Sequence, residues 1–375
     1  MNRSHVIRMY PTREQEVQLR KTAGTSRYAY NWALAKWKEM YKEYTDGVSK
    51  ERPSAFKLKS LWTKERPYWA EEVNAGSPAE AILNVGKAFQ NLWRGTGKYP
   101  QFHKKGRKES FYIANDKGKL YGNKMQVPCV GRVRLSEPLR YSGKVMSYTV
   151  STYAGQWYVA VQVDTQEDVH PACCSPQSVV GVDVGLKHIA VASDGTTCDA
   201  PDSLKRLERK LRDRQRSLSR SQRNSNNYRK RLLAKQKVQN RINNIRKDVT
   251  HKFTTTIAKN HGVVVTEDIN IRGMVKKAEH RSMRRSLGHS MMGMILWQLS
   301  YKAQKHVKAD RYFPSTKMCS CCGCVRDEVP LSERTYVCPA CGAVIDRDMN
   351  AAVNLMKSGA VNPNVPVETA STRCR

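Results

Sequence analysis

The hydrophobic pattern at the start of this 375-residue chain changes period within a few residues. Residues 5–10 alternate between apolar and polar side chains, which is typical of a short strand. Thr12 and Gln15 then fit a capping box, so the sequence predicts a helix that continues from there to about Thr22. Gly24 is expected to break this helix, because glycine is a poor helix former.

Large apolar side chains follow at helical spacing and predict a second helix with one face in a core. More helices are predicted around 54–64 and 78–93, so this part of the sequence indicates a small helical bundle. The apolar stripe consists of Tyr30, Ala33, Leu34, Trp37, Met40, Tyr41 and Tyr44.

From about residue 110 to 165 the pattern becomes one of strands. Residues 145–150 and 157–163 alternate on either side of the segment 153–156, whose Ala-Gly pair predicts a hairpin turn. Together with 124–135 and the N-terminal strand, these segments predict a small β-barrel that the helical bundle interrupts. A linker over the next residues, 169–176, is expected to mark a domain boundary.

The second half of the chain has the pattern of an α/β domain. Residues 179–185 are an apolar strand with one acid, Asp183, at its centre. Its expected hairpin partner is 187–192, closed by Asp194-Gly195. A long helical stretch is then predicted from about 203 to 260.

Another apolar strand, residues 262–267, ends in the acid Glu267. A basic, glycine-containing loop is predicted over 272–289, followed by a helix near 291–307 and a strand at 307–313. Strands that alternate with helices in this way are typical of an α/β fold.

The charge of the chain points to a polyanionic partner. Lys and Arg number 66 against 33 Asp and Glu, a formal net charge of +33 that no acidic tail balances. Nucleic acid is the expected partner, and a solvated basic surface such as that of a ribosomal protein is the alternative. The sequence contains no apolar run long enough for a signal peptide core or a membrane span, so we expect a cytoplasmic protein.

Two segments concentrate this charge. Residues 203–252 hold 18 Lys and Arg against 3 Asp and Glu, and a helix so charged is expected to lie along a phosphate backbone. Residues 95–108 are basic, contain two aromatic side chains and include helix breakers. They predict either a phosphate-binding loop or an exposed linker. The predicted nucleic-acid contacts are Lys98, Tyr99, Phe102, Lys104, Lys105, Arg107, Arg209, Arg212, Arg216, Arg220, Lys230 and Arg231.

Six of the eleven cysteines crowd into 319–341, which indicates a metal site in a reducing compartment. Two Cys-x-x-Cys pairs match a tetrahedral four-thiolate zinc site that clamps two short hairpins. Cys321 and Cys324 lie inside or beside the first pair and leave its ligands ambiguous, although Cys319 and Cys322 fit best. The predicted zinc ligands are Cys319, Cys322, Cys338 and Cys341.

Three acids, Asp183, Glu267 and Asp348, indicate a function only when they are considered as a set. Alone, a strand-end Glu is usually solvated, and Asp346 or Asp348 is placed to cap the last helix. A strand acid, a strand-end acid and a helix acid in this order are typical of an RNase H-type nuclease. Three such carboxylates suit two Mg²⁺ ions about 4 Å apart, which activate water and stabilise the leaving oxygen of a phosphodiester.

Several motifs resemble those of the TnpB family, transposon-encoded RNA-guided DNA endonucleases related to type V CRISPR effectors. They are Gly-Val-Asp183-Val-Gly-Leu-Lys187, Val-Thr-Glu267-Asp-Ile-Asn-Ile-Arg-Gly273, the paired Cys-x-x-Cys units and Asp346-Arg-Asp348-Met-Asn350-Ala-Ala352. The opening Arg-Met-Tyr-Pro-Thr-Arg-Glu-Gln, Arg27-Tyr-Ala-Tyr-Asn31-Trp-Ala-Leu and the basic loop of 98–108 resemble that family too. The likeness covers nearly the whole chain, apart from a short helical insert.

The resemblance implies an α+β multidomain protein. Its parts are an OB-like wedge β-barrel with a helical recognition insert, then an RNase H-like (RuvC) α/β domain with an inserted zinc ribbon. The implied bounds are 1–10 and 105–168 for the wedge, 11–104 for the helices, 177–314 and 344–357 for the nuclease, 315–343 for the zinc ribbon, and 358–375 for a disordered tail.

The resemblance also implies the activity and its partners. A guide RNA from the transposon end selects double-stranded target DNA, and the protein reads a short flanking motif. Asp183, Glu267 and Asp348 are the implied catalytic acids that hold two Mg²⁺ ions, with one structural Zn²⁺ elsewhere; Asp348 is preferred to Asp346 because it directly precedes Met-Asn-Ala-Ala. A monomer in a prokaryotic cytoplasm, at the nucleoid when on DNA, is expected.

Three alternatives remain at this stage. The first is an RNA-guided repressor that binds DNA without cleavage, although all three acids are present. The second is a DNA-processing transposase or an accessory protein of transposition. The third is a zinc-ribbon nucleic-acid binder without enzymatic activity, against which the acid inside the strand Val-Asp183-Val argues.

Overall fold

The computed structural model forms two compact units, Met1–Val169 and His170–Arg375, each described here by itself. The division falls at the start of the predicted linker. The residues that the structure describes are 2–106, 109–166, 174–175, 177–330 and 332–360. No helix in this described part is long and apolar enough to cross a membrane.

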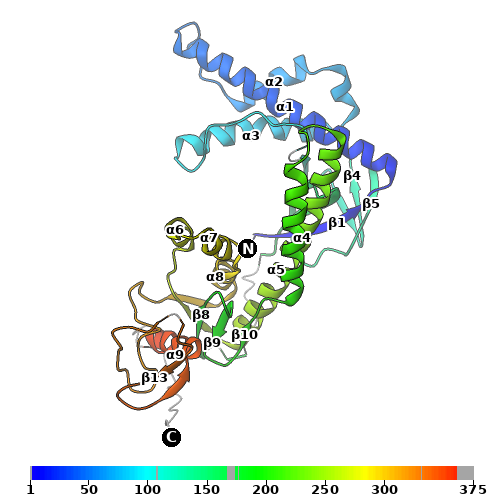
Figure 1. The fold of residues 1–375 in the computed structure, drawn as a ribbon. Coiled ribbons are helices and arrows are strands. Elements are labelled where there is room, and N and C mark those ends of the chain that lie inside the picture. The colour runs from blue at the N-terminus through cyan, green and yellow to red at the C-terminus, as the bar shows by residue number, and fades with distance from the viewer. Residues whose placement is uncertain (1, 107–108, 167–173, 176, 331, 361–375) are drawn as a thin grey trace. The chain divides into compact units, whose positions relative to one another are not determined.

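A seven-stranded antiparallel sheet forms the base of the first unit (Figure 1). Its order is β2-β6-β7-β1-β5-β4-β3. The predicted hairpin joins β6 to β7 through Ala154 and Gly155, both with positive φ, the conformation that favours glycine. The strands are β1 (Asn2–Tyr10), β2 (Glu109–Ala114), β3 (Lys119–Tyr121), β4 (Lys124–Val127), β5 (Gly131–Leu135), β6 (Lys144–Tyr153) and β7 (Gln156–Asp164).

This sheet is curled around one core but is not fully closed, so the predicted OB-like barrel stays a prediction. Side chains from both ends of the sheet, Ile113 of β2 and Leu120 of β3 among them, contribute to one core. Yet β2 and β3 are the edges of the sheet, and within the described residues no strand pairing joins them. A fully closed barrel would join these edges by hydrogen bonds, whereas an OB-like barrel is partly open.

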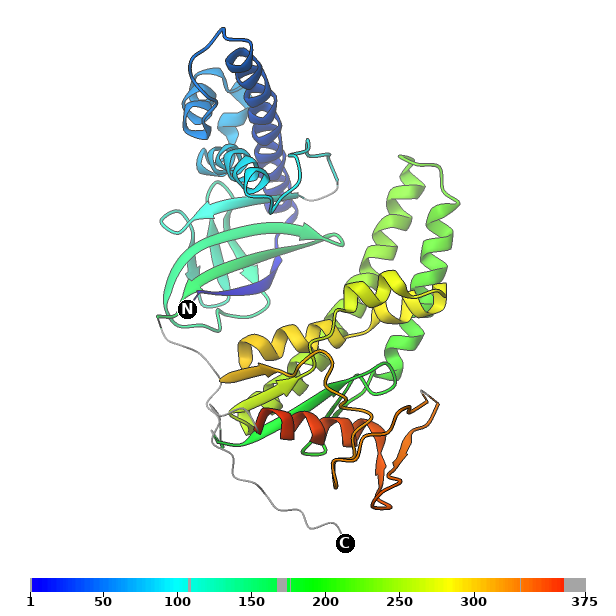
Figure 2. The same ribbon diagram turned by 90° about the vertical axis from the view of Figure 1, so that its left-hand side faces the viewer.

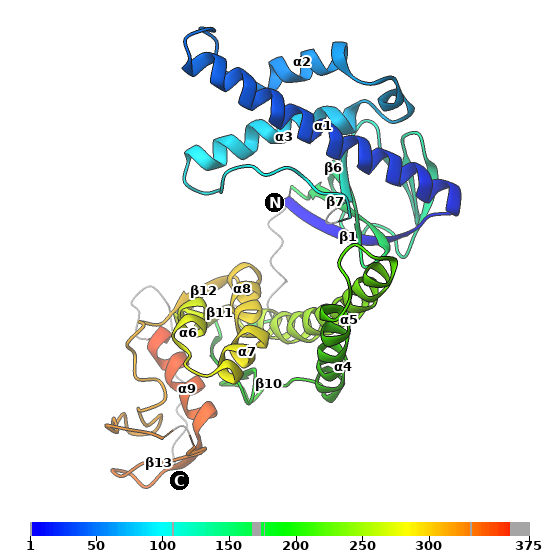
Figure 3. The same ribbon diagram turned by 45° about the horizontal axis from the view of Figure 1, so that its top comes forward.

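Three helices and a short 3-10 turn complete this unit: α1 (Arg13–Thr45), α2 (Ala55–Glu65), Tyr68–Glu72, and α3 (Gly76–Trp93). The capping box of Thr12 and Gln15 is present, and α2 and α3 match their predicted positions. Figure 3 shows α2 and α3 beside α1.

The prediction that Gly24 ends the first helix is wrong. The helix continues because α1 belongs to two cores: Leu19 and Ala23 pack against the sheet, while Ala33 and Leu34 pack among the helices. Burial on both sides of Gly24 outweighs the cost of a glycine within a helix, about 1 kcal/mol.

The second unit is built on a five-stranded mixed sheet of order β10-β9-β8-β11-β12. Strands β8, β11 and β12 are parallel to one another, with β12 at the edge, and β9 and β10 are antiparallel additions; β9 pairs with β8 as predicted. The strands are β8 (Val179–Val184), β9 (Ala190–Ala192), β10 (Thr197–Cys198), β11 (Val263–Thr266) and β12 (Lys305–Lys308).

The helical stretch predicted over 203–260 is in fact two antiparallel helices, α4 (Asp202–Ser219) and α5 (Asn226–Asn260) (Figure 2). The chain turns where Asn224 has a φ of 69° and the Ser225 side chain caps α5 by accepting the N–H of Tyr228. Polar capping residues end one helix and begin the next, a signal that the high Lys and Arg content obscured.

Three further predictions for this unit need correction. The loop predicted over 272–289 contains two short helices, α6 (Ile271–Lys277) and α7 (Arg281–His289), the second anchored by buried Leu287. The next helix, α8 (Met292–Lys302), ends before 307, and β12 precedes the strand predicted at 307–313. Lys305 pairs with Val263 of β11, so neighbouring β11 determines where β12 begins.

The remaining chain forms a small two-stranded sheet and a final helix: β13 (Thr335–Val337), β14 (Val344–Asp346) and α9 (Arg347–Ala360). The prediction of a disordered tail over 358–375 is wrong for Ser358, Gly359 and Ala360, which are still helical. The residues beyond, 361–375, lie outside the described part.

Helix α9 packs against the sheet with almost no space between the backbones. A Cβ atom added to Gly181 of β8 would overlap with the carbonyl oxygen of Ala352 and the amide nitrogen of Met356. One added to Gly359 would overlap with Val265 of β11. The absence of two side chains thus lets α9 lie directly on β8 and β11, while α5 and α8 contribute to the core on the opposite face.

We expect Gly181→Ala to lower the free energy of unfolding of the second unit by about 3 kcal/mol, the upper range for overpacking, because α9 would have to move. Denaturant unfolding measures this change. Gly288→Ala in exposed α7, with no atom within 4 Å of the added carbon, is the control and should stabilise by up to about 1 kcal/mol. An unchanged Gly181→Ala protein would contradict the close packing of α9.

Candidate functional site

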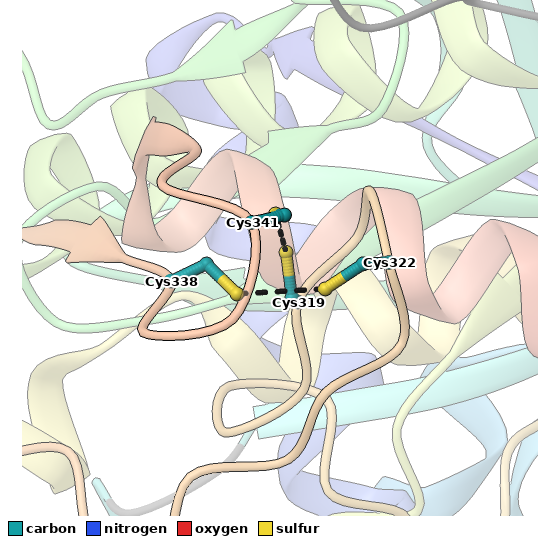
Figure 4. A group of neighbouring side chains, drawn as sticks. All are labelled: Cys319, Cys322, Cys338 and Cys341. Atoms are coloured by element: carbon teal, nitrogen blue, oxygen red, sulfur yellow. Dashed lines mark hydrogen bonds between the residues drawn. The ribbon is translucent and has the colours of Figure 1, made fainter.

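The structure brings the sulfur atoms of four cysteines together (Figure 4). Cys319 and Cys341 are separated by 3.8 Å between their Sγ atoms, and Cys322 and Cys338 by 3.5 Å. All four ligand atoms lie within 4.8 Å of one another. Within the described residues, no other group of three or more His, Cys, Asp and Glu side chains has such an arrangement.

These separations fit zinc. Tetrahedral Zn–S bonds of about 2.3 Å place ligand sulfurs about 3.8 Å apart. Backbone N–H groups, that of Cys341 first and then that of Ala340, favour a thiolate at Cys338 and lower the pKa of that thiol. Cys321 and Cys324, the competing candidates, are outside the group of four.

Two of the predicted acids lie at the carboxyl ends of neighbouring strands in the five-stranded sheet. In the parallel pair of β8 and β11, Val182 is aligned with Thr266, so Asp183 and Glu267 are the next residues on neighbouring strands. Asp183 has the same parity as Gly181, whose face carries α9. The carboxyl ends of parallel strands in one sheet are where functional groups converge.

The third acid comes from the first turn of α9. Asp346 is occupied by capping, since its Oδ1 accepts the backbone N–H groups of Asp348 and Met349, both at 3.0 Å. Asp348 is not engaged by the cap; its side chain is 14% exposed and lies 3.7 Å from the guanidinium of Arg347 and 4.0 Å from that of Arg334. The two aspartates thus have different surroundings: Asp346 caps α9, whereas Asp348 lies beside two arginines.

The three acids influence one another electrostatically. Burial, and then the negative charges of Glu267 and Asp348, raise the pKa of Asp183 to about 7, while the nearby charge of Arg347 opposes this shift. A cluster of carboxylates that repel one another favours a bound cation. The charges of Glu267 and Asp348 are thus felt at Asp183, although the three acids are contributed by β8, the residue after β11 and α9.

Two asparagines whose structural role the sequence reasoning missed connect α9 to the cysteine knuckle, the segment around Cys319 and Cys322. Asn350 accepts the N–H of Ser320 at 2.8 Å, and both Asn350 and Asn354 donate to the carbonyl of Met318, at 2.7 and 2.6 Å. Both asparagines are completely buried. Their i, i+4 spacing beside Ala351, Ala352 and Leu355 was the available signal, because two amides on an apolar helix face require polar partners.

The basic loop is held against α1. The Asn31 side chain accepts the N–H of His103 at 2.7 Å and donates to its carbonyl at 3.0 Å, and the His103 ring stacks on Tyr30. Tyr99 and Phe102 lie beside the ammonium of Lys38, with ring centroids 5.5 and 4.8 Å away. All the predicted contacts of this loop that the structure describes are exposed, namely Lys98, Tyr99, Phe102, Lys104 and Lys105; Arg107 lies outside the described residues.

The predicted contacts on α4 and α5 are exposed as well, with one qualification. Arg231 donates to the carbonyl of Ser217, at 3.1 Å, and to the hydroxyl of Ser221, at 2.8 Å, so it links the two helices. The other predicted contacts in this hairpin are Arg209, Arg212, Arg216, Arg220 and Lys230.

Substitution of a zinc ligand should separate the four-thiolate site from the other cysteines. We expect Cys338→Ser to lose the bound metal and reduce the folded yield, because a small metal site contributes its binding energy to folding. Zinc content per chain, measured by atomic emission, tests this. Cys321→Ser is the control and should keep one zinc; loss of zinc from that variant alone would overturn the assignment.

Models of three known protein families match parts of this chain. A model described as a probable transposase matches residues 156–278, one described as a helix-turn-helix domain matches 1–46, and one described as a Cas12f1-like TNB domain matches 293–355. The second description does not fit the structure, in which residues 2–45 form β1 and the uninterrupted helix α1.

Relatives that match over almost the whole chain identify its family. A putative RNA-guided DNA endonuclease from Streptomyces pristinaespiralis is 30% identical over 367 residues, which cover 96% of this chain and 90% of that protein. The putative RNA-guided DNA endonuclease InsQ from Escherichia coli (strain K12) is 27% identical over 372 residues, covering 94% and 91%. In fold, the chain is similar to the protein in a cryo-EM structure of a Cas12f1-sgRNA-target DNA complex, with a TM-score of 0.56, 16% identity and coverage of 91% and 83%. This chain belongs to the TnpB family.

Proposed function

We propose that this protein is an RNA-guided DNA endonuclease of an insertion sequence, and that Asp183, Glu267 and Asp348 form its cleavage site. The observation that carries the proposal is the convergence of these acids. Asp183 and Glu267 lie at the ends of two neighbouring parallel strands. Asp348 is carried to them by helix α9, which packs directly on Gly181. The whole-length relatives named as endonucleases support the same reaction.

The donor chemistry of the site fits magnesium. Carboxylate oxygens are the ligands that Mg²⁺ prefers, whereas thiolates prefer zinc. When bound, two Mg²⁺ ions would activate a water molecule and stabilise the leaving oxygen of the phosphodiester. Asp183, Glu267 and Asp348 would hold these ions and fix where the scissile phosphate binds.

The zinc site has a different task. Cys319, Cys322, Cys338 and Cys341 would hold one structural Zn²⁺, since four thiolates leave no open position for a substrate. Around them lies a core of only a few side chains, with Tyr336 at its centre. Metal ligation therefore replaces the hydrophobic core that so small a segment lacks.

The basic surfaces suit the partners that we propose, a guide RNA from the transposon end and double-stranded target DNA with a short flanking motif. If base pairing selects the sequence, the protein needs mainly contacts to phosphates, which agrees with a net charge of +33. The exposed cations of α4 and α5 and the basic loop on α1 supply such contacts. One chain holds all three acids and all four thiolates, so we propose a monomer.

Substitution of each acid tests the cleavage site. We expect Asp183→Ala, Glu267→Ala and Asp348→Ala to lower the rate of guided plasmid cleavage about a thousandfold or more, because several kcal/mol of charge stabilisation are lost. RNA and DNA binding, measured by gel shift, should persist. The guide for this assay is obtained by sequencing the RNA that copurifies with the protein expressed beside its native flanking DNA.

Asp346→Asn is the matched control, because its side-chain oxygen still caps α9. This variant should cleave like the wild type. Rapid cleavage by any of the three alanine variants would remove that residue from the site. A wild-type protein that binds target DNA with its guide and never cuts would support the repressor instead.

A further inference from the structure

A buried serine outside the four-cysteine cluster contacts one of the proposed catalytic acids. Ser315, 3% exposed, donates its hydroxyl hydrogen to Oε1 of Glu267. The two residues are 48 positions apart, so the contact depends on tertiary structure. A carboxylate held through one oxygen has a fixed orientation and keeps its other oxygen available for a cation.

The backbone of Ser315 is fixed by two hydrogen bonds. Its N–H donates to the carbonyl of Phe313 at 2.8 Å, and its carbonyl accepts from Asn354 of α9, also at 2.8 Å. The same Asn354 amide reaches Met318, the residue before the zinc-site Cys319. Ser315 therefore links α9 to Glu267 by hydrogen bonds, and Asn354 links both to the cysteine knuckle.

The backbone that carries Glu267 is fixed as well. The next residue, Asp268, pairs with Lys308 at 3.1 Å and with Arg311 at 3.0 Å, and the N–H of Ala309 donates to the carbonyl of Thr266. With the backbone held in this way, the remaining freedom of Glu267 is rotation of its side chain. The hydroxyl of Ser315 restricts that rotation.

We propose that Ser315 is a positioning residue for Glu267, which it orients to bind a divalent cation, and that Asn354 holds Ser315 in place for this task. The inference rests on the proposed function, because it assigns Glu267 to the cleavage site. It adds that the zinc-bearing segment helps to build the carboxylate site through a defined contact, in addition to its own stability. Loss of a partner that orients a metal ligand typically lowers metal affinity or activity about 10- to 100-fold.

The experiment compares Ser315→Ala with Thr316→Ala, which removes a hydroxyl from the neighbouring residue of the same segment. Mn²⁺ serves as the probe ion, and electron paramagnetic resonance measures its affinity for the full-length protein without nucleic acid. Zinc content and thermal unfolding are measured on the same samples. The Mg²⁺ concentration for half-maximal guided cleavage is the fourth measurement.

We expect Ser315→Ala to keep its zinc and to melt within a few degrees of the wild type, while its Mn²⁺ affinity falls about 10-fold or more. The half-maximal Mg²⁺ concentration should rise in parallel, and Thr316→Ala should match the wild type in every measurement. Wild-type Mn²⁺ affinity in Ser315→Ala would overturn the proposal, and so would loss of zinc or an equal defect in Thr316→Ala. A wild-type protein that neither binds Mn²⁺ nor cleaves would refute the proposed function itself.

Discussion

The contact between the backbone of α9 and that of β8 at Gly181 is the constraint on which the second unit depends. It determines how close the first turn of α9, and with it Asp348, comes to Asp183 on the same face of the sheet. It also presents Asn350 and Asn354 to the cysteine knuckle, whose carbonyl groups they bind. One missing side chain thus sets the geometry of the carboxylate cluster and the attachment of the metal-binding segment.

The two predicted metal sites illustrate opposite uses of buried charge. At the cysteines, short Cys-x-x-Cys loops bring four sulfur atoms together, and backbone N–H groups favour the thiolate form that binds zinc. The metal would stabilise a segment that is too small for a hydrophobic core of its own. At the acids, burial and mutual repulsion raise the pKa of Asp183, and the charge of Arg347 offsets this only in part. The first site needs no substrate to be complete, whereas the second has a shortage of positive charge that bound cations would offset.

Sequence reasoning succeeded where the signal is local. The cysteine spacing, the strands around Asp183 and Glu267, and the capping box at Thr12 each lie within a few residues, and the structure contains all of them. It failed where distant packing decides, as at Gly24, which remains helical because two cores bury its surroundings. The partners of Asn354 and Ser315 lie 36 to 48 residues away, so no short pattern reveals them. The strands of the predicted OB-like barrel are present, but closure depends on distant pairing between β2 and β3, which the described residues do not show.

The order of elements along the chain has a consequence during protein synthesis. Asp183 and Asp348 are 165 residues apart, so a ribosome adding roughly 5–20 residues per second needs on the order of ten seconds or more to pass from one to the other. The basic helices α4 and α5 are made within that interval, before the last acid exists. Under the proposed function, a nascent chain therefore carries its basic helices before Asp348 completes the carboxylate site.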